Sequence, residues 1–96
     1  MAAQKNKEQI LHQLENLLEK VKLQTKDAAD VDLRVFEPQV HGQPYIVEIS
    51  QARYTRRVPV EYHTALALKL NQPDPALMRE LRTAIMAVRR LAAKYR

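Results

Sequence analysis

The spacing of apolar residues changes twice along this 96-residue chain, and that change limits the fold more than any other feature. Residues 6–25, and again residues 75–95, repeat apolar side chains every three to four positions, which is helical spacing. Between them, residues 31–58 alternate apolar and polar side chains, as a half-buried strand does. The pattern predicts an α+β fold, and the length predicts a single domain over residues 1–96.

The first helix is predicted over residues 6–25, with Asn6 as its N-cap and Gln9 completing a capping box. Its apolar stripe is wide and rich in Leu: Ile10, Leu11, Leu14, Leu17, Leu18 and Val21. A stripe of this width must be covered, either by the chain's own sheet or by a partner helix. The heptad-like run is too short to indicate a coiled coil.

A meander of three antiparallel strands is expected next, over residues 31–36, 45–50 and 54–58. The only glycine of the chain, Gly42, marks the turn between the first two strands. Residues 50–53 form the second turn. The third strand is open to extension as far as Tyr62.

Residues 59–70 fit two structures. Pro59 suits the first position of a helix, and good helix formers follow it. The same stretch can instead continue the third strand. The favoured prediction is a strand to Val58 or Val60, then a short helix to Leu70.

A long last helix is predicted over residues 75–95, opened by Asp74 as N-cap and Pro75 as first residue. Met78 and Met86, on or near its apolar face, are expected to fill the core. That face comprises Leu77, Leu81, Ala84, Ile85, Val88, Leu91, Ala92 and Tyr95. The helices are expected to pack on one face of the sheet.

Charge is sorted along the chain. Residues 1–50 carry a net charge of −2 and residues 51–96 a net charge of +7. Most basic residues of the second half are Arg, whose planar fork of donors suits phosphate and carboxylate groups. An Arg-rich half on a small chain indicates an anionic partner.

Two groups of residues are candidates for contacting nucleic acid. The last helix offers a basic stripe of Arg79, Arg82, Arg89, Arg90, Lys94 and Arg96, offset only by Glu80. The second turn and third strand offer Arg53, Tyr54, Arg56 and Arg57. Such residues can contact phosphates, and Tyr can stack on a base. The stripe can also be a solvated face or can pair with acidic residues of the first helix in a dimer, and strand arginines can protect a sheet edge. Arg56 and Arg57 are expected on opposite faces of the strand.

Other chemistry finds little support in the residues. The chain has no Cys, and His12, His41 and His63 lie too far apart in the sequence to suggest metal ligands. His63, beside Glu61 and Tyr62, is interpreted as part of a helix N-terminal turn. No enzyme, cofactor or metal is expected. Without a long apolar run or a signal peptide, we expect a cytoplasmic protein that does not enter a membrane.

The order of helix, three-stranded meander and C-terminal helix resembles that of small YbaB-type nucleoid-associated proteins, which are dimers that bind DNA. IVEISQARYTRRVPVE has the cadence of their strand–turn–strand segment, but their Gly-rich pattern is absent. TRRVPVEYHTALALKL followed by PALMRELRTAIMAV is similar in layout to a ribbon–helix–helix repressor, although NQPDP replaces the usual Gly-containing turn. Neither resemblance assigns a role to a particular residue.

The sequence therefore predicts a small basic protein that binds nucleic acid or acts as a regulatory protein. It would contact the phosphate backbone through its Arg-rich half and would not be an enzyme. The alternative is an adaptor or assembly subunit that docks an acidic protein. An RNA-cleaving toxin is a third possibility, for which Tyr54, Arg56 and His63 would have to converge. A homodimer is expected through the Leu-rich first helix, so that Leu14→Asp would dissociate it.

Overall fold

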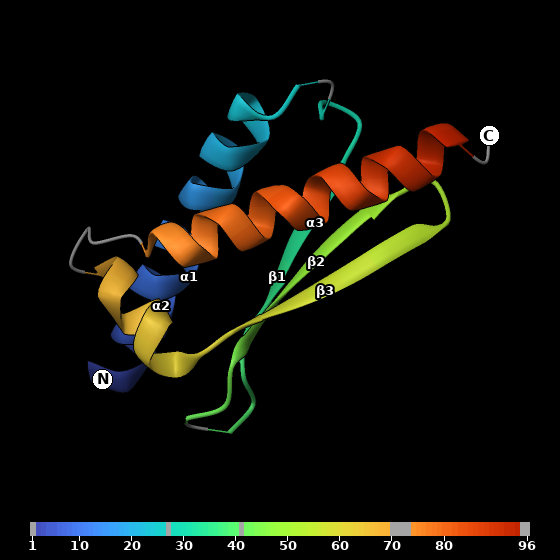
Figure 1. Cartoon of the computed structure of the whole chain (residues 1–96). Helices are drawn as coiled ribbons and strands as arrows, with labels where there is room; N and C mark the ends of the chain where they lie inside the picture. Colours follow the sequence, from blue (N-terminus) through green and yellow to red (C-terminus); the bar gives the residue numbers. More distant parts are fainter. Residues whose placement is uncertain (1, 27, 41, 70–73, 95–96) are drawn as a thin grey trace.

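The structure is a computed structural model that describes residues 2–26, 28–40, 42–69 and 74–94, with side chains from residue 8 on except that of residue 69. Its elements are, in order, α1 (Ala2–Gln24), β1 (Asp32–Phe36), β2 (Tyr45–Gln51), β3 (Tyr54–Val60), α2 (Tyr62–Lys69) and α3 (Pro75–Lys94). The strands form an antiparallel sheet in the order β1-β2-β3, and the two C-terminal helices pack on it. The predicted α+β meander with its N-terminal helix is confirmed (Figure 1).

Alternation along the strands gives the sheet two unlike faces. Val47 and Ile49 of β2 are buried beneath the helices, whereas the residues between and beside them are half-buried. The opposite face carries a row of charged residues, because the strand register aligns Arg34, Glu48 and Arg57. Among the described elements, no helix covers this second face.

The helices close the core by covering different strands. α3 packs across β2 and β3, α1 packs beside β1, and α2 packs against α1. Figure 1 shows α3 running along the sheet toward the end where a hairpin joins β2 to β3. The core combines side chains of the sheet and of α1 and α3, and its largest fully buried members are Ile10, Leu14, Val21, Val31, Tyr45, Val47, Ile49, Val60, Leu81, Ile85 and Val88.

The Leu-rich face of α1 is covered within the chain. Ile10, Leu14 and Val21 are each at most 1% exposed and belong to the same buried cluster as the sheet. The choice of this face as a dimer interface is therefore wrong, because the surface that was to join two copies is already inside one. The stripe is covered within the chain, by α2 and α3 together with β1 of the sheet, and not by a partner helix.

The predicted start of the first helix is also wrong. α1 begins at Ala2, so Asn6 lies inside the helix and does not cap it. Good helix formers, including Ala2 and Ala3, precede Asn6 and extend the helix backward.

The favoured prediction for residues 59–70, a strand to Val58 or Val60 followed by a short helix, is confirmed. β3 ends at Val60 and contains Pro59, and α2 begins at Tyr62. An edge strand tolerates Pro, and no described strand lies on the outer side of β3.

The other predicted boundaries hold where the structure describes them. The backbone N–H of Ala76 donates to Asp74 Oδ1 at 2.9 Å, which confirms the cap of α3. Two turn residues have a positive φ: Gly42, with a φ of 90°, and Ala52 in the β2–β3 turn, with a φ of 55°. Met78 packs against the core as expected, but Met86 is 38% exposed, so its predicted role as core filler is wrong.

Candidate nucleic-acid interface

A cleft of about 290 Å³ lies between the outer edge of β3 and the adjacent flank of α3. Three of the residues that line it are arginines, and they come from both groups that the sequence singled out: Arg56 and Arg57 from β3, and Arg79 from α3. The other lining residues are Val58, Ala76, Glu80, Thr83 and Ala84. We call this feature the basic cleft. It joins two sets of cations that α2 separates in the sequence.

The strand register divides the two neighbouring arginines of β3. Arg56 pairs with the buried Ile49, so it lies on the face of the sheet that the helices cover. Arg57 pairs with Glu48 on the uncovered face, and its Nε donates to Glu48 Oε2 at 3.2 Å. The predicted division of these residues between opposite faces is confirmed. Arg57 therefore forms the rim of the basic cleft, whereas Arg56 and Arg79 supply its inner cations.

The arginines of α3 spread over two flanks of the helix. Arg79 lines the basic cleft, whereas Arg82 donates from Nη2 to Oε1 of Gln24, at the end of α1, at 3.3 Å. At about 100° per residue, Arg90 falls on the flank of Arg79, and Arg89 on that of Arg82. The predicted basic stripe therefore covers both flanks of α3. Only the flank that carries Arg79 and Arg90 faces the basic cleft.

The hairpin between β2 and β3 holds the remaining candidates of the strand group. The guanidinium carbon of Arg53 lies 5.6 Å from the centre of the Tyr54 ring, within the range of a cation–π interaction. Tyr54 itself is half-buried and packs against the core. One interaction of its ring is thus with Arg53 at the hairpin. Arg96, the last candidate, lies outside the described residues.

The residues of the proposed catalytic arrangement do not converge. Tyr54 lies at the hairpin end of β3, and His63 lies on α2, beyond the other end of the strand. A strand of this length spans about 20 Å. The interpretation of His63 as part of a helix N-terminal turn is confirmed, because α2 begins at Tyr62 and the carbonyl of Glu61 accepts from the N–H of Ala65 at 2.9 Å. His41 falls outside the described residues.

The part of the chain that the structure describes offers neither a metal site nor a membrane span. No group of three His, Cys, Asp or Glu side chains is placed to hold a metal ion there. Nor does any described helix combine the length and apolar character needed to cross a membrane.

Thr83 is a lining residue that the sequence did not single out. It lies four positions after Arg79, and residues four apart share one side of a helix. Its hydroxyl can donate to an anion that Arg79 already attracts. The helical spacing from Arg79 is the signal that would have placed it in the site.

Comparison of the chain with protein-family models, with curated proteins and with solved structures found no match. The resemblances in element order to nucleoid-associated proteins and to ribbon–helix–helix repressors therefore carry no further argument. What the basic cleft binds must be inferred from its own chemistry.

Proposed function

We propose that this protein binds nucleic acid through the phosphate backbone, with the basic cleft as its centre. The convergence of Arg56 and Arg79 on one cleft is the observation that carries the proposal, since the two residues come from separate elements. Neither side chain makes an ion pair with a described residue. Arginine bonds phosphate oxygens with a planar fork of donors, so two such groups in one cleft suit a phosphodiester.

The cations also extend beyond the cleft, which favours a polymer over a small anion. α3 is 20 residues long, and a helix of that length spans about 30 Å. Arg90 continues the flank of Arg79 by helical spacing. α3 runs toward the β2–β3 hairpin (Figure 1), whose turn contains Arg53. Successive phosphates of a nucleic-acid strand can occupy such a row, and each contact releases counterions.

An acidic protein segment is the second candidate for the cleft. Its specific support is the apolar part of the lining, formed by Val58, Ala76 and Ala84, together with the carboxylate of Glu80. Apolar contacts favour a peptide with both acidic and apolar side chains, whereas Glu80 repels a phosphate. Binding of a mixed-sequence duplex separates the two candidates, because only the nucleic-acid proposal requires it.

Two arginines of the same helix provide a matched test. Arg79 and Arg82 are both exposed on α3, three residues apart, but only Arg79 lines the basic cleft. We expect Arg79→Ala to weaken binding of a fluorescein-labelled duplex by about tenfold and to lower the salt slope by about one. Arg82→Ala, which removes the same charge, should have a clearly smaller effect.

A second pair of arginines, one on each edge strand, extends this comparison to β3. Arg56 lies in the cleft, whereas Arg34 lies on the opposite edge of the sheet, and both are exposed. Fluorescence anisotropy should show a loss of affinity for Arg56→Ala and little loss for Arg34→Ala. Equal losses for both members of each pair would mean that general charge, and not the cleft, attracts the nucleic acid.

The proposal places the protein in the cytoplasm, with which a chain free of Cys is compatible. It does not require a second copy, because one chain supplies every residue that lines the cleft. The predicted homodimer stays a prediction, and light scattering on the purified protein tests it.

A further inference from the structure

The two edges of the sheet differ in how well they are protected against pairing with another strand. β3 carries Arg56 and Arg57 and has Pro59, which lacks an N–H, near its end. Charged side chains and Pro are common means of blocking an edge strand. β1 pairs only with β2 among the described strands. It also carries charged residues, Asp32 and Arg34, but it contains no Pro, so each of its residues keeps an N–H group. Its outer row of N–H and C=O groups is therefore the more open of the two.

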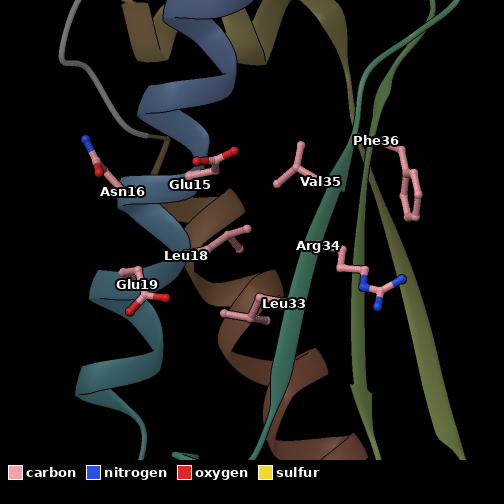
Figure 2. Close-up of a pocket in the computed structure, with 8 residues that line it drawn as sticks. All are labelled: Glu15, Asn16, Leu18, Glu19, Leu33, Arg34, Val35 and Phe36. Carbon is pink, nitrogen blue, oxygen red and sulfur yellow. The ribbon is translucent and has the colours of Figure 1, made fainter.

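A groove of about 480 Å³ follows this open edge, between β1 and α1. Leu33 and Val35 are half-buried and pack against the hydrophobic core. Figure 2 shows both side chains on the α1 side of β1, and those of Arg34 and Phe36 on the opposite side. A strand added beside β1 would lie about 4.8 Å away and would enter this groove.

The α1 wall of the groove is acidic. Glu15 and Glu19 line it, and Figure 2 shows Glu15 directed from α1 toward β1. Neither carboxylate forms a hydrogen bond or an ion pair with a described residue. The one basic lining residue, Arg34, has its side chain on the far side of β1. The groove thus combines a strand edge, an apolar floor and two unneutralised negative charges.

We propose that β1 accepts an extended basic peptide as an additional strand, whose Lys or Arg side chains on the helix side meet Glu15 and Glu19. Strand addition uses backbone hydrogen bonds for affinity and alternate side chains for selectivity. On the uncovered face, the added side chains lie beside Arg34 and Phe36, where apolar residues fit better than basic ones. The peptide therefore alternates basic and apolar residues.

The charges favour this occupant over a second copy of the chain. Antiparallel pairing of two β1 strands would bring the Glu15 and Glu19 carboxylates of both copies to one junction, where like charges repel. Pairing of β1 with β3 of another copy would meet the blocked edge at Pro59. A basic peptide meets neither obstacle.

The test uses a short fluorescein-labelled peptide in which Lys alternates with Val, titrated with the full chain at physiological salt. We expect saturable binding to the wild type and about fivefold weaker binding to the double variant Glu15→Gln/Glu19→Gln, as two partly exposed ion pairs would give. Glu8→Gln/Glu61→Gln removes the same charge outside both the groove and the basic cleft and should leave the affinity unchanged, because charges beyond about 8 Å are screened.

Backbone pairing needs its own control. A peptide of the same sequence that is N-methylated at every residue has no N–H group on either edge, so it cannot form the ladder and should not bind. Hydrogen exchange should show slower exchange of β1 amides only with the unmethylated peptide. The proposal is overturned if the wild type does not bind the Lys–Val peptide, if the methylated peptide binds equally well, or if Glu15→Gln/Glu19→Gln has no effect. A protein whose mass doubles with concentration and that binds no peptide would assign the edge to a second copy instead.

Discussion

The buried hydroxyl of Tyr45 lowers the stability of the folded state locally. The hydroxyl of Tyr45 is buried and makes no hydrogen bond to a described group. Burial, and then the nearby Glu37 and Tyr62, raises the pKa of this phenol above its ordinary value. The folded state therefore holds Tyr45 in its neutral form, and an unsatisfied buried hydroxyl costs about 1–3 kcal/mol.

We expect Tyr45→Phe to increase the free energy of unfolding by about 1 kcal/mol at neutral pH, because it removes that unsatisfied hydroxyl. The pH dependence should change as well. In the unfolded chain the phenol ionises near pH 10, so the contribution of a raised folded pKa is complete below about that pH and is lost as pH rises through the folded value. Thermal unfolding followed by circular dichroism should show a flatter alkaline decline for Tyr45→Phe. A less stable variant would mean that the hydroxyl has a partner.

The ion pair between Arg57 and Glu48 is exposed, and its loss should have little effect on stability. The Arg57 side chain is 70% exposed, so the pair contributes less than about 1 kcal/mol to stability. Glu48→Gln should therefore leave the melting temperature nearly unchanged. It should also tighten duplex binding by about twofold to threefold, since it frees Arg57 at the rim of the cleft. Glu61→Gln removes the same charge at a residue outside the cleft and should not give that gain.

Among the elements, α1 differs most from its predicted role, because it was expected to form a dimer interface. Its apolar stripe forms part of the core, with Leu14 fully buried, so Leu14→Asp places an uncompensated charge inside the protein. A loss of about 3–5 kcal/mol is expected, a large share of the stability of a domain this size. Circular dichroism should show an unfolded or strongly destabilised chain and not a folded monomer released from a dimer. Leu23→Asp on the same helix, at a residue 84% exposed, should be nearly neutral.

The periodicity of apolar residues was sufficient to predict α1, the three strands, α3 and their order, but it left residues 59–70 open between strand and helix. The alternation at Val47 and Ile49, and the helical spacing from Leu77 to Val88, reflect burial on one side of β2 and of α3. Boundaries were predicted less well, because they depend on neighbours. Pro59 suits a helix start locally, but pairing of β3 with β2 extends the strand past it.

The candidate site was only partly visible in the sequence. Arg56 and Arg79 were each identified from local charge, but their meeting in one cleft depends on the packing of α3 against β3. Likewise, no local pattern shows that Arg82 reaches Gln24 while Arg79 does not. Tertiary packing decides which flank of a helix faces a neighbour, and a single amphipathic pattern does not contain that information.

The whole molecule presents opposite charges at the two edges of one sheet. The basic cleft follows β3, and the acidic groove of Glu15 and Glu19 follows β1. A nucleic acid at the first edge and a basic peptide at the second would occupy separate surfaces of the same chain. β2 lies between the two edge strands, and the groove and the basic cleft share no lining residue.

The most direct test of the central claim is the affinity of the wild-type protein for a mixed-sequence duplex, measured by fluorescence anisotropy over a range of salt concentrations. The basic cleft and its continuation along α3 should neutralise about four phosphates, which predicts a slope of log K against log salt near −3.6. Micromolar binding at low salt that falls with this slope would support phosphate-backbone binding. An affinity that does not change with salt, or no binding at low salt, would contradict it.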